Sequence, residues 1–75
     1  MKLLVVEDDA KLARFLARIL IESGYAVDTC RTVSDTLRQA ETGLYDLLVL
    51  DWMLPDGDGL SIVRELRERG SRLRS

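Results

Sequence analysis

The chain has 75 residues, a formal net charge of −2, 47% hydrophobic and 32% charged residues, and no histidine. This length allows one small domain, and the composition is that of a folded α/β or helical protein rather than a disordered one. The missing histidine excludes histidine acid–base catalysis, histidine metal ligands and a role as a histidine phosphodonor. Carboxylate chemistry remains, and the small net charge favours neither nucleic acid nor a membrane surface.

The expected location is the cytoplasm. The apolar runs are far shorter than the ~20 residues that a membrane helix needs. Met1 leads directly into a strand-like run with acids behind it, which is not a secretory signal. The single cysteine, Cys30, has no internal disulfide partner, which suits a reducing compartment.

The first predicted elements are a buried strand and an amphipathic helix. Residues 3–6 form an unbroken apolar run that ends at acidic residues, typical of a parallel strand covered on both faces. A helix follows from Ala10, with Asp9 as its N-cap and Gly24 just beyond its end. Its apolar positions, expected to face inward, are Leu12, Phe15, Leu16, Ile19 and Leu20.

The next strand and helix are shorter. Residues 25–30 alternate in polarity, which predicts an edge strand. Thr32 is expected to cap a helix that runs to Thr42 and is closed by Gly43. Its inward-facing positions are expected to be Val33, Leu37 and Ala40.

The third strand is predicted at residues 47–50, and Asp51 follows it directly. After a turn, Asp58 can cap a third helix that ends near Gly70, with Leu60, Ile62, Val63 and Leu66 as its apolar positions. The order βαβαβα predicts a parallel sheet with right-handed crossovers and strand order 2-1-3. Residues 64–75 are rich in arginine, including Arg72 and Arg74, and form either a solvated face and tail or a partner surface.

Acidic residues follow the two strands that are expected to be neighbours. Glu7 and Asp8 come after the first strand, and Asp51 comes after the third. Because the carboxyl ends of parallel strands share one sheet edge, these groups are expected to meet there. Three such carboxylates repel one another unless a cation intervenes, and they suit Mg²⁺. A carboxylate oxygen of Asp51 could then attack phosphorus and form an aspartyl phosphate.

Simpler interpretations exist for each acidic group. Residues 7–9 could be charges favoured by a helix N-terminus, and Asp51 could be a turn or helix cap. Residues 56–59 resemble a calcium loop superficially, but they lack its ladder of acids and its final glutamate, so a turn plus cap is expected. Neither a glycine-rich nucleotide loop nor the Asp-x-Asp nucleophile of dehalogenase-like phosphatases is present.

The string VVEDD at residues 5–9, together with DWMLPDGDG at residues 51–59, strongly resembles the receiver domain of bacterial two-component response regulators. The resemblance covers essentially the whole chain and implies a flavodoxin-like, doubly wound α/β fold. It implies that Asp51 is the phosphoacceptor, that Asp8 binds Mg²⁺ directly and Glu7 through water, and that the carbonyl of Met53 is a further ligand. Asp9 is better explained as a helix cap, and Trp52 is expected near the metal.

The same resemblance implies what residues 1–75 do not contain. A full receiver has five βα units, with a hydroxyl residue ending strand four, an aromatic on strand five and a lysine after strand five. The chain is therefore expected to be the N-terminal portion of one receiver, and its phosphorylation to be slow or short-lived. The implied partner is a sensor histidine kinase, and nucleic acid is reached only through an output domain outside this chain.

Three functions are compatible with these residues. The first is a phosphoacceptor signalling domain, not an enzyme in its own right, that takes a phosphoryl group from a phosphohistidine with Mg²⁺. The second is an assembly module without a working switch, and the third is a phosphate-ester hydrolase, which multiple turnover would reveal. A homo-oligomer is also expected, most simply a dimer through the third-strand edge or exposed helix faces.

Overall fold

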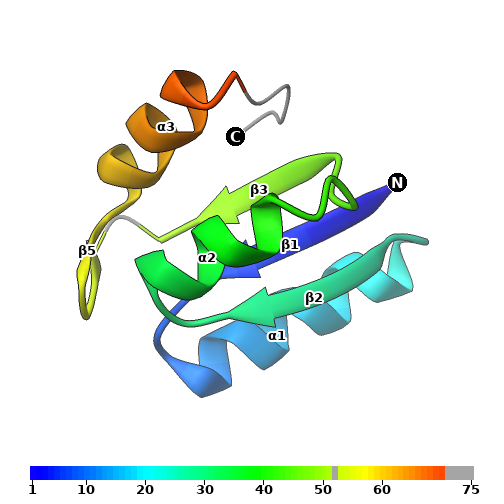
Figure 1. Ribbon diagram of the computed structural model, residues 1–75. Helices are drawn as coiled ribbons and strands as arrows, with labels where there is room; N and C mark the ends of the chain where they lie inside the picture. The colour runs from blue at the N-terminus through cyan, green and yellow to red at the C-terminus, as the bar shows by residue number, and fades with distance from the viewer. Residues whose placement is uncertain (52, 71–75) are drawn as a thin grey trace.

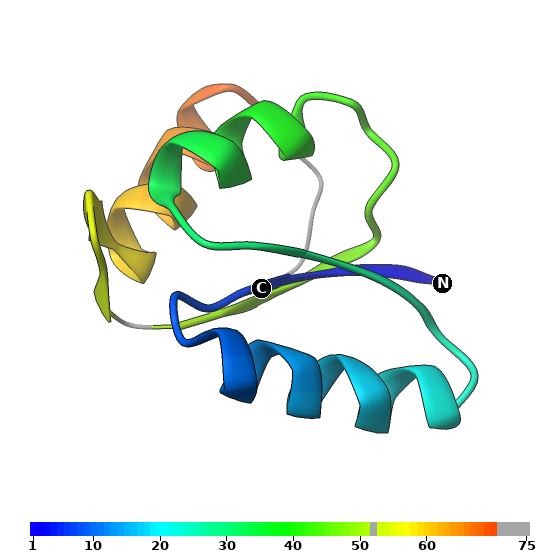
Figure 2. The ribbon, with the colours of Figure 1, turned by 90° about the horizontal axis from the view of Figure 1, so that it is seen from below.

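A computed structural model describes residues 1–51 and 53–70. A three-stranded parallel sheet lies between α1 on one face and the pair α2 and α3 on the other (Figures 1 and 2). The sheet consists of β1 (Lys2–Val6), β2 (Ala26–Cys30) and β3 (Leu47–Leu50), and the helices are α1 (Ala10–Glu22), α2 (Val33–Ala40) and α3 (Gly59–Glu68). A short antiparallel hairpin, β4 (Met53–Leu54) and β5 (Gly57–Asp58), connects β3 to α3.

The strand order β2-β1-β3 confirms the predicted topology. The central strand β1 is parallel to both neighbours, and its last residue, Val6, is in register with Cys30 of β2 and Leu50 of β3. Residues 3–6 are almost fully buried, as the unbroken apolar run predicts. The three strands therefore end level with one another at the same edge of the sheet.

Each helix begins at the cap that the sequence predicts. The Asp9 carboxylate accepts the backbone N–H of Lys11 and Leu12, and the Asp58 carboxylate accepts that of Ser61. The Thr32 hydroxyl likewise accepts an N–H in the first turn of α2. These side chains satisfy donors that have no partner within their helix, which fixes where each helix starts.

The main core lies between the sheet and the α2–α3 layer. Leu4 and Val6 of β1 belong to it, and the alternation along the strand turns Leu3 and Val5 toward α1. The buried members of this core are Leu4, Val6, Cys30, Tyr45, Leu48, Leu54, Ile62 and Leu66. Val33, Leu37 and Ala40 pack against it, which confirms the predicted inner face of α2.

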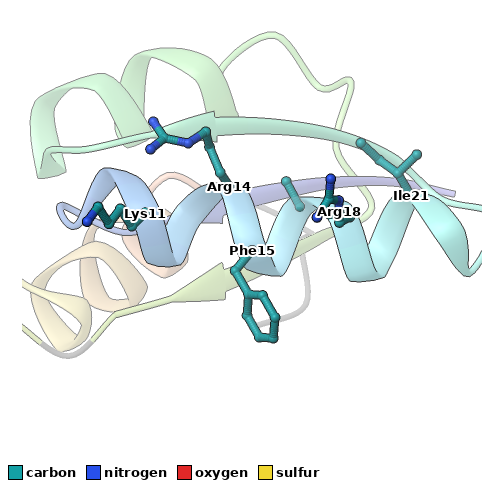
Figure 3. A pocket seen from close by; sticks show the side chains of 6 residues that line it. Lys11, Arg14, Phe15, Arg18 and Ile21 are labelled. Carbon is teal, nitrogen blue, oxygen red and sulfur yellow. The ribbon is translucent and has the colours of Figure 1, made fainter.

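The predicted inner face of α1 is only partly correct. Ala13 is the buried residue of this helix, while Leu12 is 42%, Phe15 59% and Ile19 43% exposed. Figure 3 shows Phe15 and Arg14 extending from α1 in opposite directions. The apolar arc of α1 is wider than the surface that β1 and β2 offer it, so its outer part has no covering element among the described residues.

Smaller differences concern element ends. The helix α2 stops at Ala40, two residues before the predicted end, although Gly43 does adopt a left-handed φ of 71° beyond it. Leu60 of α3 is 39% exposed instead of buried. The β4–β5 hairpin was expected only as a turn, because two-residue strands leave no periodicity to read. Within the described residues, no helix has the length and hydropathy required to cross a bilayer.

Candidate metal and phosphoacceptor site

The sheet register brings the acidic residues of two strands together. Glu7 and Asp51 each stand one residue beyond the paired positions Val6 and Leu50. The Asp51 N–H donates to the carbonyl of Val6 at 2.8 Å, and the Glu7 N–H donates to that of Cys30 at 3.0 Å. Backbone hydrogen bonds therefore hold both residues at the carboxyl edge of the sheet.

Asp8 completes a cluster of three carboxylates. One carboxylate oxygen each from Glu7, Asp8 and Asp51 can be chosen so that all lie within 4.8 Å of one another. Glu7 is buried, Asp51 is half-buried and Asp8 is exposed, so the cluster opens to solvent on one side. The structure thus brings together the three acids predicted from the sequence.

Glu7 is electrostatically the least favourable member of this cluster. Burial raises the pKa of its carboxyl, and the nearby Asp51 charge raises it further. The backbone N–H of Asp9, 3.1 Å from Glu7 Oε1, opposes this increase in part. A buried carboxylate beside another acid favours either a proton or a cation in the site.

The other residues predicted from the sequence lie outside this carboxylate cluster or outside the described residues. Met53 lies two positions beyond Asp51 at the start of β4 and is 68% exposed, and the ligand predicted from it is its backbone carbonyl. Trp52, expected near the metal, lies outside the described residues, as do Arg72 and Arg74. Asp9 caps α1, as predicted, and does not join the cluster.

Two residues near the site were not predicted. A Cβ placed on Gly59 would stand 3.0 Å from the carbonyl oxygen of Asp51, so the start of α3 approaches the acceptor backbone closely. The guanidinium of Arg31 donates to the carbonyl of Asp8 at 3.2 Å. The sequence did carry a signal for the Gly59 contact, because a glycine directly after the Asp58 cap indicates a close approach of backbone. The only signal for Arg31 was its position directly after a strand end.

The donor set fits a hard divalent cation. Mg²⁺ favours oxygen ligands, uses few carboxylates and keeps positions for water and a phosphate. The clustered oxygens supply the negative charge, and the exposed side leaves room for such a ligand. Fold and site together define a class of protein. It is a doubly wound α/β protein with an acidic, cation-binding type of site at the carboxyl edge of its sheet.

Comparison with known proteins gives the family. Residues 3–74 match the family model described as the response regulator receiver domain. The transcriptional regulatory protein DltR of Streptococcus agalactiae is 46% identical over 70 residues, which is 93% of this chain and 31% of that protein. The transcriptional regulatory protein CusR of Escherichia coli is 48% identical over 67 residues, covering 89% of this chain and 30% of that protein.

Solved structures of receiver domains have the same fold as this chain. The response regulator TrrA of Thermotoga maritima, in complex with Mg²⁺ and BeF, matches with a TM-score of 0.86 at 34% identity, over 91% of this chain and 59% of that one. A complex of the histidine kinase ThkA with TrrA matches with a TM-score of 0.88 at 32% identity, over 96% of this chain and 62% of that one. The chain belongs to the receiver domain family of response regulators. It spans about a third of the length of these curated relatives.

Proposed function

We propose that this chain accepts a phosphoryl group on Asp51, with Mg²⁺ held by Glu7, Asp8, Asp51 and the backbone carbonyl of Met53. The observation that carries the proposal is the meeting of three carboxylates, from the ends of two parallel strands, within 4.8 Å at the carboxyl edge. In the family resemblance the same positions carry the acceptor and the acidic pair. TrrA, a relative in structure, is itself described in complex with Mg²⁺ and BeF.

The proposed reaction is a transfer between two proteins. A carboxylate oxygen of Asp51 attacks the phosphorus of a phosphohistidine, an O–P bond forms and the P–N bond breaks. The electron pair of that bond returns to the imidazole nitrogen, which takes up a proton from solvent. When bound, Mg²⁺ would neutralise charge on the phosphoryl oxygens and on the acids around them. Glu7 and Asp8 hold the charge that attracts this cation, and the backbone bond to Val6 fixes Asp51 in position.

The phosphodonor that we propose is a sensor histidine kinase. The chain contains no histidine and so cannot supply the donor itself. The matched complex of ThkA with TrrA shows that a receiver of this fold is bound by such a kinase. By likeness to DltR and CusR, the output of the signal is control of transcription through a region outside residues 1–75.

Titration with Mg²⁺ tests the metal half of this proposal. Amide signals of residues 7, 8 and 51 in a ¹H–¹⁵N NMR spectrum are expected to shift with saturation behaviour. Asp8→Asn should weaken that binding by ~10-fold or more, because it removes a charged oxygen ligand. A folded protein whose spectrum ignores Mg²⁺ at millimolar concentration would contradict the site.

We also propose that the chain forms a dimer. The apolar stripe defined by Leu12, Phe15 and Ile19 on α1 is exposed, and among the described residues β3 pairs only with β1. Both are surfaces that a second copy can cover. The comparisons do not favour assembly as the chain's sole function, since they identify a receiver domain.

A further inference from the structure

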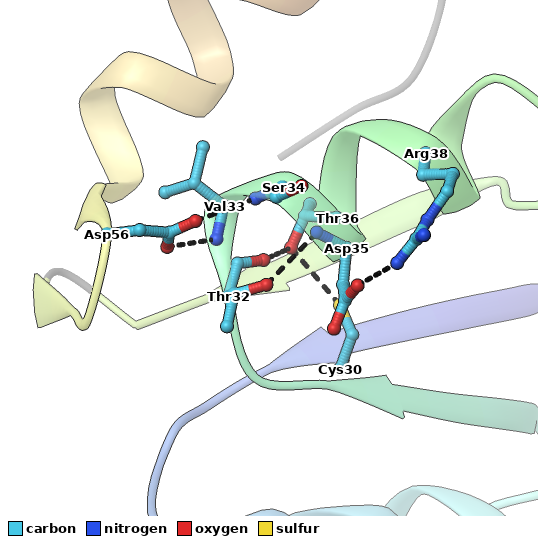
Figure 4. A network of polar contacts seen from close by, with 8 residues as sticks. All are labelled: Cys30, Thr32, Val33, Ser34, Asp35, Thr36, Arg38 and Asp56. Carbon is cyan, nitrogen blue, oxygen red and sulfur yellow. Dashed lines mark hydrogen bonds and ion pairs between the residues drawn. The ribbon is translucent and has the colours of Figure 1, made fainter.

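The β4–β5 hairpin is attached to the start of α2 by one side chain. Asp56, in the hairpin turn, accepts the backbone N–H of Val33 through Oδ1 at 2.7 Å and that of Ser34 through Oδ2 at 3.1 Å (Figure 4). These are the first two residues of α2, whose N–H groups have no acceptor within the helix. The hairpin therefore caps a helix that lies more than twenty residues earlier in the chain.

The local cap of α2 leaves these two donors to Asp56. Thr32 accepts the N–H of Asp35 at 3.0 Å and does not serve Val33 or Ser34. A carboxylate that accepts two N–H groups at the positive end of a helix makes charge-assisted hydrogen bonds. These bonds lower the pKa of Asp56, so its side chain is ionised at neutral pH.

A second, independent contact joins the same two segments. A Cβ on Gly57 would stand 3.0 Å from Cγ2 of Val33 and 3.2 Å from Oγ of Ser61. The first residue of β5 thus packs directly on the first residue of α2, so closely that an added methyl group would force the neighbouring side chains to shift. Hydrogen bonding and packing both fix the hairpin against this helix.

Each of the two joined segments leads to the acidic cluster. The hairpin begins two residues after Asp51 and ends at Asp58, and the next residue, Gly59 of α3, approaches the Asp51 carbonyl. On the other side, α2 follows Cys30, whose carbonyl accepts the Glu7 N–H at 3.0 Å and whose Sγ lies 3.1 Å from the Thr36 hydroxyl (Figure 4). Asp56 therefore closes a loop of contacts that includes the backbones of Asp51 and Glu7.

We propose that Asp56 is a positioning residue for the metal and phosphoacceptor site. By holding the hairpin on the N-terminus of α2, it fixes the backbones of Asp51 and Met53 relative to Glu7 and Asp8. This inference rests on the proposed function, because the geometry that it fixes is that of the Mg²⁺ ligands. Asp56 itself does not touch the metal or the phosphoryl group.

The test compares variants by NMR and urea unfolding. Asp56→Ala removes both hydrogen bonds, whereas Thr32→Ala removes the local cap of the same helix and leaves the hairpin untouched. Asp35→Asn removes one negative charge from the first turn of α2, also without touching the hairpin. In the metal-free protein, Asp56→Ala should shift the amide signals of residues 51 and 53, and the two controls should not.

Mg²⁺ affinity is the second measurement. Asp56→Ala is expected to weaken Mg²⁺ binding by at least fivefold, and Asp56→Asn, which keeps one acceptor oxygen, by less. The affinities of Thr32→Ala and Asp35→Asn should stay within twofold of the original protein, even where Thr32→Ala unfolds at lower urea. A structural role alone would instead make Mg²⁺ affinity follow stability, with Thr32→Ala and Asp56→Ala affected alike.

The outcomes separate the two proposals. If Mg²⁺ does not shift the amide signals of the original protein, the proposed function is refuted, and with it the role of Asp56 at that site. Normal Mg²⁺ binding by the original protein, together with unchanged affinity and unchanged residue 51 and 53 signals in Asp56→Ala, refutes the positioning role alone. If Asp56→Ala does not fold, Asp56→Asn decides, and unchanged affinity in that variant overturns the proposal.

Discussion

The Glu7 carboxylate favours Mg²⁺ binding but lowers the stability of the metal-free fold. Its carboxyl is buried beside Asp51, and its raised pKa means that the folded state holds the proton more tightly than the unfolded state does. Stability contributed by this group therefore falls as the pH rises from the ordinary value of 4.5 through the raised pKa. Ionisation of Glu7 therefore destabilises the metal-free fold.

Glu7→Gln is accordingly expected to raise the free energy of unfolding in metal-free buffer at neutral pH. The same change should weaken Mg²⁺ binding by ~10-fold or more, the usual effect of losing an outer ligand that orients a metal site. Urea unfolding with and without Mg²⁺ measures both effects. A variant that is less stable without metal and equally stabilised by Mg²⁺ would contradict this account of Glu7.

Gly59 lies close against the backbone of Asp51, and this approach depends on its having no side chain. Gly59→Ala would place a methyl group 3.0 Å from the Asp51 carbonyl oxygen, a backbone atom that cannot rotate away. Overpacking of this kind costs about 1–3 kcal/mol, which exceeds the ~1 kcal/mol that alanine gains in a helix. We expect lower stability in urea and weaker Mg²⁺ binding. Arg64→Ala, an exposed change on the same helix, is the control, and equal stability of the two variants would refute the contact.

At the scale of elements, the α2–β3 connection is joined to β2 by Tyr45. Its hydroxyl donates to the Asp28 carboxylate at 2.5 Å, and Lys2 lies 3.3 Å from the same carboxylate. This hydrogen bond lowers the pKa of Asp28, whereas burial and the Asp28 charge raise the pKa of Tyr45 to about 12. The pair therefore connects β2 to the segment before β3, with β1 between them.

The pH dependence of this connection has a definite sign. Because the unfolded tyrosine titrates near 10.0 and the folded one near 12, its stability contribution is complete below pH 10.0 and is lost as the pH rises toward 12. The contribution of Asp28 is present above its ordinary pKa of 3.8 and is lost as the pH falls through its lowered pKa. Tyr45→Phe should cost about 1–2 kcal/mol at neutral pH and flatten both slopes. Urea unfolding between pH 3 and pH 11 measures this, and unchanged slopes would contradict it.

The sequence predicts the large elements because each is specified locally. The unbroken run at residues 47–50, the alternation before Cys30 and the caps Asp9, Thr32 and Asp58 all lie within a few residues of what they determine. The parallel pairing of the first and third strands, which brings Glu7 and Asp51 to one edge, followed from the alternation of strands and crossover helices. The three acids of the site were therefore predictable.

Contacts between distant segments were not predictable. The role of Asp56 depends on where the hairpin lies relative to α2, and neither segment has a pattern that names the other. Tyr45 is buried in a connection whose neighbouring residues are polar or exposed. The exposure of Leu12 and Phe15 likewise depends on how much of the α1 apolar arc the sheet covers, and periodicity does not contain that information.

At the scale of the whole molecule, the exposed stripe on α1 predicts self-association. Figure 3 shows the hollow on this helix, lined by Lys11, Arg14, Phe15, Ala17, Arg18 and Ile21, and none of the site carboxylates lines it. Phe15→Glu should shift the dimer toward monomer in sedimentation velocity without lowering stability, since Phe15 is 59% exposed. Glu22→Ala, an exposed change on the same helix that does not line this hollow, is the control. Original protein that sediments as a compact, cooperatively folded monomer at micromolar concentration would contradict the dimer.

The central claim is that Asp51 accepts a phosphoryl group in a Mg²⁺-dependent reaction. Incubation of the folded protein with Mg²⁺ and a small phosphodonor such as phosphoramidate, followed by intact-mass measurement at successive times, tests it most directly. We predict the mass increase of one phosphoryl group, formed slowly, abolished by chelation of Mg²⁺ and absent from Asp51→Asn. Labelling that persists in Asp51→Asn, or folded protein that remains unlabelled after prolonged incubation with Mg²⁺, would contradict the account.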